Sequence, residues 1–176
     1  MTRAIHPGAV VGALCLFSLG QFYLMADPSD VLTFHNDMAR TGQTLHEQIL
    51  AVTNVNASHF GKLWVLPTDD KVLAQPLYAA GISIPGLGMR NVLFIESEND
   101  TAYAYDADST EVLWQTSLAG FCEQPYQTEI CTIKPQLGVT ATPVIDRQYG
   151  ANGAIFIQAM SEDLWATRIS ACTRWI

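Results

Sequence analysis

An internal repeat constrains the fold of this 176-residue chain more than any other feature. When the sequence is shifted by 62 positions, short strand-like segments coincide without a gap: Leu93-Phe94-Ile95 with Ile155-Phe156-Ile157, and Tyr103-Ala104 with Trp165-Ala166. Upstream, Gln75-Pro76-Leu77 matches Thr142-Pro143-Val144 if a few residues are absorbed in the intervening loop. A four-strand unit that repeats with loop insertions is typical of a β-propeller blade, whereas the alternative is a chance similarity between two β-rich segments.

The segments around the repeat are expected to be β-strands. They are short and rich in strand-forming residues, and they cover residues 75–79, 91–95, 101–106 and 112–118. Turn-forming residues separate them at 85–88, 98–100 and 106–110. A parallel βαβ arrangement would need longer helical segments between the strands. The sequence therefore predicts an all-β chain of antiparallel strands with about two β-propeller-like blades, which is an incomplete propeller.

The first 26 residues have the order of a secretory signal peptide with an apolar signal helix. An apolar run from Ala9 to Leu24 follows a positively charged start, and Ala26 precedes the polar segment Asp27-Pro28-Ser29-Asp30. Cleavage after Gly20 is an alternative. The run is also nearly long enough to span a bilayer, so an uncleaved membrane anchor is a second alternative. We therefore expect a secreted or periplasmic protein with no membrane contact beyond this signal or anchor.

The cysteines agree with an oxidising compartment. Cys122 and Cys131 lie in one polar stretch, and a disulfide that closes this loop is the expected arrangement. A metal site would need a second cysteine pair or histidines at short spacing, and none are near. Cys15 would leave with the signal peptide, and Cys172 would then be unpaired.

The charge of the chain argues against nucleic-acid binding. The formal net charge is −8, from 17 acidic and 9 basic residues, and the chain lacks the cluster of Lys and Arg that displaces counterions from a polyanion. One acidic stretch could suggest a calcium site, but it lacks the EF-hand loop pattern. We predict instead that this stretch forms a solvated rim; its members are Glu96, Glu98, Asp100, Asp106, Asp108 and Glu111.

The segment from Ala104 to Trp114 resembles the blade signature of the quinoprotein (PQQ-type) propellers. Ala104, Asp106 and Trp114 stand where that family has Ala, Asp and Trp, while Ser109 replaces Thr and Thr110 replaces Gly. The resemblance implies that the Asp and Ser side chains bind backbone groups of a tight turn. It also implies that the Trp packs between adjacent blades. A β-branched residue resists positive φ, so Thr110 predicts a different turn type.

The resemblance extends upstream into an arm that leads to the first blade. Phe34 to Gly42, Asn54-Val55 and Lys62-Leu63-Trp64 are similar to the corresponding segment of quinoprotein dehydrogenases, and Ala74 to Tyr78 looks like the start of the first blade. The implied division is a signal peptide (1–26), an arm (27–61), a first blade region (62–118), a Cys-containing loop (119–139) and a partial second blade (140–176). His35, Asp37 and Arg40 in the arm could form an acid–base cluster, but a hydrogen-bonded turn is the simpler interpretation.

The resemblance implies pyrroloquinoline quinone (PQQ) and calcium as cofactors of full-length relatives. In those enzymes a carboxylate just before the Pro-Leu of the first blade contacts the quinone, and two adjacent cysteines often lie against it. Here the five residues before Pro76, Lys71 to Gln75, include no Asp or Glu, and no cysteines are adjacent. We therefore expect no catalytic residue and no bound cofactor in this chain on its own.

The second copy of the signature has decayed, because the same shift places Arg168 on Asp106 and Ala171 on Ser109. The chain is then either the product of a truncated gene or a short protein that pairs with copies of itself through exposed sheet edges. The expected function is an exported, truncated quinoprotein-like fragment, non-catalytic on its own and at most a binding scaffold. The alternative is the N-terminal part of a PQQ-dependent alcohol or sugar oxidoreductase.

Overall fold

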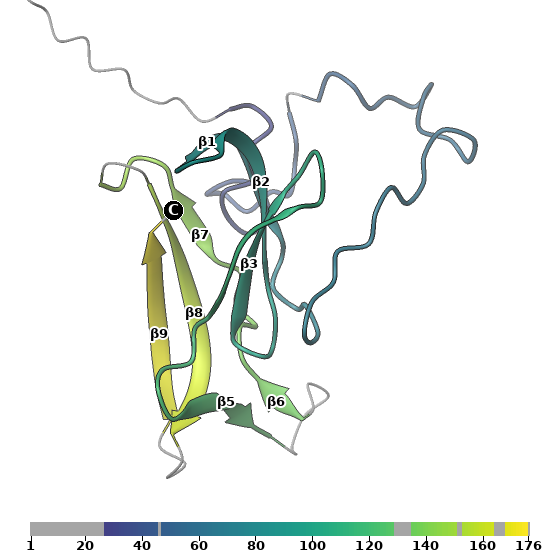
Figure 1. Cartoon of the computed structure of the whole chain (residues 1–176). Coiled ribbons are helices and arrows are strands. Elements are labelled where there is room, and N and C mark those ends of the chain that lie inside the picture. Colours follow the sequence, from purple (N-terminus) through teal and green to yellow (C-terminus); the bar gives the residue numbers. More distant parts are fainter. Residues whose placement is uncertain (1–26, 46, 129–134, 151–152, 164–167, 176) are drawn as a thin grey trace, which may run out of the picture.

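The chain folds into two antiparallel β-sheets, as a computed structural model of it shows (Figure 1). The structure describes residues 27–45, 47–128, 135–150, 153–163 and 168–175. No helix occurs in these residues, which confirms the predicted all-β class. The predicted signal segment, residues 1–26, lies outside them. Within the described ranges, no helix is long and apolar enough to cross a membrane.

The first sheet is a meander of four consecutive strands, β1 (Leu77–Ile84), β2 (Gly88–Glu96), β3 (Thr101–Asp106) and β4 (Val112–Ser117). These strands confirm the four predicted segments. The β1–β2 turn has a φ of 80° at Gly86 and 78° at Gly88, a backbone region that glycine enters without a steric cost.

The second sheet is built around one long strand. It comprises β5 (Glu123–Gln127), β6 (Gln136–Leu137), β7 (Val144–Asp146), β8 (Ala154–Asp163) and β9 (Arg168–Trp175). β9 pairs along one edge of β8, so β7 and β5 share the other edge, at opposite ends of β8. The segment expected as a Cys-containing loop, 119–139, thus contains two short strands. The polar sequence of β5 does not alternate between apolar and polar residues, so it does not predict a strand. β5 is a strand because it pairs with the distant β8.

The strand register confirms the upstream half of the repeat. Leu77 pairs with Phe94 in the first sheet, and Val144 pairs with Phe156 at the equivalent place in the second. The gapless match of the third strand, which aligned Ala104 with Ala166, is wrong. Phe94 pairs with Ala104 in the first sheet, and the equivalent Phe156 pairs with Thr173 in the second. β8 continues to Asp163 and carries a bulge after Ile157, so the hairpin that follows it is longer. Trp165-Ala166, the predicted match, lies outside the described residues.

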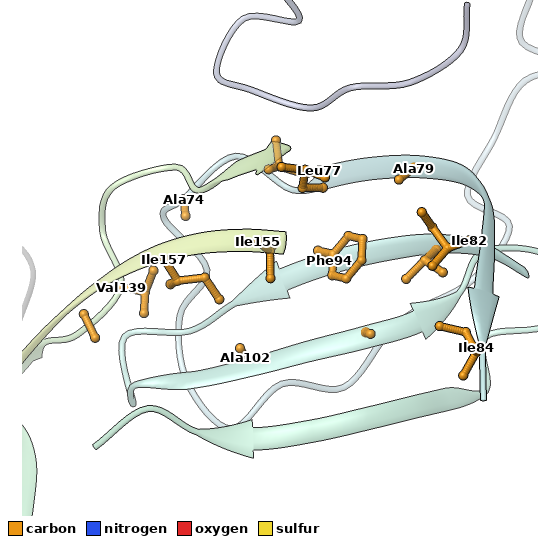
Figure 2. Close-up of a cluster of buried hydrophobic side chains, with 14 residues drawn as sticks. Ala74, Leu77, Ala79, Ile82, Ile84, Phe94, Ala102, Val139, Ile155 and Ile157 are labelled. Carbon is orange, nitrogen blue, oxygen red and sulfur yellow. The ribbon is translucent and has the colours of Figure 1, made fainter. Parts of the chain in front are cut away.

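The two sheets pack face to face around one apolar cluster (Figure 2). The first sheet contributes Leu77 and Phe94, and the second contributes Ile145, Ile155 and Ile157, all of which are buried. Figure 2 shows Ile155 and Ile157 of β8 facing the first sheet near Phe94. Burial of this shared cluster holds the two sheets together.

The opposite face of the first sheet is covered by residues 66–72, which we call the strap. Leu66 and Val72 of the strap pack against a second cluster of Ile95, Tyr103 and Tyr105. Two tyrosines fix the strap: the Tyr105 hydroxyl donates to the Pro67 carbonyl oxygen, and the Asp69 N–H donates to the Tyr103 hydroxyl at 3.0 Å. Residues 66–72, which belong to the predicted first blade region, therefore form a covering segment without a strand.

The arm, residues 27–61, joins the edges of the two sheets. Val31 forms a two-way bridge with Tyr78 of β1, and the N–H of Ile145 in β7 donates to the Leu32 carbonyl at 2.8 Å. Asp30 forms a buried ion pair with Arg147, whose other terminal nitrogen donates to the Ala80 carbonyl. Beyond this contact much of the arm is a wide loop that stands away from the sheets (Figure 1).

Candidate functional site

The signature residues meet at the β3–β4 turn. The Asp106 carboxylate accepts the N–H groups of Asp108 at 2.9 Å and Ser109 at 3.1 Å, and its other oxygen lies 3.2 Å from the Nε of Arg90. The Ser109 hydroxyl lies 3.5 Å from the N–H of Glu111, at the limit of a hydrogen bond. Asp106 therefore caps the turn and also anchors it to β2, which makes its role structural.

Thr110 differs from the expectation drawn from its β-branched side chain. Its φ is 67°, the left-handed conformation that a glycine adopts freely. Hydrogen bonds from Thr110 N–H to the Asp106 carbonyl and from Asp106 N–H to the Glu111 carbonyl, at 2.9 and 2.8 Å, close the turn around it. These bonds, together with the Asp106 cap, outweigh the steric cost.

Ala104 and Trp114 are directly opposite each other on β3 and β4. The Trp114 ring lies 6.0 Å from the Phe94 ring and packs, partly buried, against the cluster shared by the two sheets. A bulge follows in β4, where Tyr105 pairs with Val112. All four signature residues thus lie at the β3–β4 hairpin, and Trp114 contributes to the packing between the sheets.

The predicted solvated rim is wrong for four of its six residues. Glu96, Glu98, Asp100 and Asp106 are buried, while Asp108 and Glu111 are exposed as predicted. The second sheet packs on the face that carries Glu96, and the distant 138–140 loop closes over Glu98. Neither contact is visible in the local sequence. No group of three His, Cys, Asp or Glu side chains in the described part of the chain could hold a metal ion.

Glu98 links the two halves of the fold. Its carboxylate accepts the Gly138 N–H at 2.8 Å and the Thr140 hydroxyl at 2.9 Å. A Cβ at position 138 would lie 2.4 Å from the Glu98 carbonyl oxygen and 2.7 Å from the Asp100 carboxylate. Only glycine allows this close approach of the 138–140 loop to the β2–β3 turn.

Glu96 and Asp100 are the two buried carboxyls without a hydrogen-bond partner among the described residues. Burial raises the pKa of Glu96 from 4.5 to about 8. Burial, and then repulsion by Glu98 and Glu123, raises the pKa of Asp100 from 3.8 to about 7. Sequence reasoning missed both groups, because a run of acidic residues gives no local sign of burial.

The polar residues of the arm form a hydrogen-bonded turn, which confirms the simpler interpretation. The Asp37 carboxylate accepts bonds from the N–H and hydroxyl of Thr41, and these bonds lower its pKa. The Nδ1 of His35 lies 3.2 Å from the Arg40 carbonyl, and the Arg40 guanidinium lies 5.6 Å from the Phe34 ring. Asp37 is thus bound to Thr41, and His35 to the backbone of Arg40, so the three residues do not form an acid–base cluster.

The residue just before Pro76, Gln75, is hydrogen-bonded to the arm. The Gln75 side-chain oxygen accepts the His35 N–H at 3.1 Å, and the Gln75 N–H donates to the Thr142 hydroxyl at 3.0 Å. The resemblance implies a carboxylate against the quinone at this position. This chain instead has the Gln75 amide, whose oxygen is already hydrogen-bonded to the backbone of the arm.

The predicted disulfide stays a prediction. Cys122 is exposed and is a free thiol in the structure, and Cys131 lies outside the described residues.

Comparison of the chain with protein-family models, curated proteins and solved structures finds no match.

Proposed function

We propose that this chain is an exported, quinoprotein-like β-propeller unit that acts as a binding scaffold and does not catalyse oxidation on its own. The observation that carries the proposal is the repeated register: Leu77–Phe94 and Val144–Phe156 are equivalent pairs in two sheets that pack face to face. Blades of a propeller pack in this way. The hydrogen-bonded signature turn at Asp106 supports the same assignment.

The absence of catalysis is proposed from the chemistry at Gln75. A quinone with several carboxylates, held with a divalent cation, needs charged ligands that converge on it. Here the equivalent position offers an amide whose oxygen binds His35. The alternative is the N-terminal part of a PQQ-dependent alcohol or sugar oxidoreductase, and the signature from Ala104 to Trp114 favours that lineage.

The deciding experiment is calorimetric titration of the exported protein with PQQ and calcium, followed by a dye-linked oxidation assay with alcohols and sugars. We expect neither tight binding nor turnover. Micromolar or tighter binding, about −8 kcal/mol, would overturn the proposal. Gln75→Glu restores the missing carboxylate and is the matched variant. If it alone gains quinone binding, the oxidoreductase lineage is supported.

Export is tested separately. The mature protein should begin near Asp27, where the apolar run ends before a polar turn. N-terminal sequencing of protein recovered outside the cytoplasm measures this directly, and intact Met1 in a membrane fraction would favour the anchor.

A further inference from the structure

The internal interface joins opposite faces of the two repeats. The first sheet uses the face that carries Leu77 and Phe94, whereas the second uses the face that carries Ile145 and Ile155. By register, Ile145 is equivalent to Tyr78 and Ile155 to Leu93, which lie on the other face of the first sheet. The sheets are therefore stacked head to tail, and such an interface can continue at both ends.

One of these two ends is open in the described part of the chain. Val144 and Phe156 occupy the positions of Leu77 and Phe94, which are fully buried, but Val144 is 43% exposed and Phe156 is only half-buried. Tyr149 packs edge-on against Phe156 and is itself 43% exposed. We call Val144, Tyr149 and Phe156 the open face.

A hollow of about 330 Å³ adjoins the open face. It lies between the arm and β7, and its lining includes Leu32, Met38 and Val144. Met38 is 91% exposed. Exposed apolar side chains that gather beside a hollow mark an interaction surface more strongly than scattered ones do.

The other end of the stack is closed by the strap. The face that matches the open face is the one of Leu93 and Ile95, equivalent to Ile155 and Ile157, and Leu66 and Val72 of the strap cover it. The Asp69 carboxylate secures the strap by accepting hydrogen bonds from three side chains at 2.6–2.8 Å, those of Ser97, Asn99 and Thr101.

We propose that the open face is a docking site for the first sheet of a second copy of this chain, and that the strap is the cap that prevents this docking. The docked interface would continue the one inside the chain, because it would bring together the same faces in the same order. The proposal depends on the repeat geometry alone, and it stands whether or not the chain is exported or binds quinone.

The strap and the open face can be tested by sedimentation of the exported chain. The double variant Leu66→Asp and Val72→Asp places two charges under the strap and should release it. Its weight-average mass should rise by at least about twofold with concentration, because head-to-tail interfaces extend. The wild type should stay monomeric over the same range.

Adding Val144→Asp to the strap variant removes the other half of the interface and should restore the monomer. Leu87→Asp, at a partly exposed leucine in the β1–β2 turn away from the strap and the open face, is the matched control and should leave the association unchanged. If the double variant loses the circular dichroism of its sheets, Asp69→Ala releases the strap without adding a buried charge and should give the same association.

Three results would overturn the proposal. The first is a folded strap variant that stays monomeric. The second is association that Val144→Asp leaves intact, because the exposed apolar surface would then aggregate without using the open face. The third is a wild-type dimer that Val144→Asp dissociates, since that would show two open faces paired with each other.

Discussion

Glu96 should make the stability of this protein fall as the pH rises. Its carboxyl lies opposite Ala102 on the face of the first sheet that packs against the second, and it has no hydrogen-bond partner there. Its pKa is about 8 in the folded chain and 4.5 as the usual value. Between these two pH values, the folded protein holds a proton that the unfolded chain has released. The free energy of unfolding therefore decreases across this window and levels off above it.

The magnitude follows from the size of the shift. One pKa unit is worth about 1.4 kcal/mol, so between pH 4 and pH 8 Glu96 should remove about 4 kcal/mol from the free energy of unfolding. Glu96→Gln keeps the shape of the side chain but cannot titrate. The variant should therefore become more stable relative to the wild type by that amount as the pH rises from 4 to 8.

Urea titrations at several pH values, followed by tryptophan fluorescence, measure both proteins on the same scale. Asp100 titrates in both and cancels in the difference. Glu111→Gln, at an exposed position, is the matched control for the loss of one carboxylate. Parallel stability curves for wild type and Glu96→Gln, within about 1 kcal/mol at every pH, would refute the burial argument.

Three further substitutions test the packing. Thr110→Gly should stabilise the protein by about 0.5–1 kcal/mol, because relief of the left-handed backbone exceeds the entropic cost of glycine; Ser109→Gly, beside it, should destabilise. Gly138→Ala should cost more than about 2 kcal/mol through the clash at 2.4 Å, whereas Gly61→Ala, with open space around it, should change stability by less than about 0.5 kcal/mol. Trp114→Ala should cost about 2–3 kcal/mol, below the range for a fully buried ring. Denaturant unfolding checks each, and a Trp114→Ala cost under about 1 kcal/mol would contradict its place in the shared cluster.

The strands could be predicted because their information is local. Leu93-Phe94-Ile95 and its repeat carry strand-forming residues between turn formers. The repeat placed Phe156 opposite Val144 correctly once the extra residues of the intervening loop were allowed for. The third strand of the second sheet could not be placed in this way, because β8 is extended by pairing with β5, which comes from a polar segment without alternation.

The buried carboxyls were missed for a related reason. Glu98 is satisfied by Gly138 and Thr140, about forty positions away, so its burial depends on contacts that no short window contains. Thr110 shows the converse case, since its own propensity pointed away from a conformation that the Asp106 cap imposes. Tertiary contacts determine the burial of Glu98, a hydrogen-bonded cap determines the backbone conformation of Thr110, and local residue preference determines where the strands form.

The position of the arm between β1 and β7 sets an order for folding during synthesis. Asp30 is made early, but its partner Arg147 emerges 117 residues later. At about 5–20 residues per second, the arm therefore waits roughly 6–23 s for its anchor. During that time Val31 can already pair with Tyr78, but the ion pair that locks it is missing. The edge of β1 is then held only by this bridge and by the hydrogen bond from the Ala80 N–H to the Asp30 carboxylate, at 2.8 Å. Slow synthesis lengthens the period in which another nascent chain can pair with this edge.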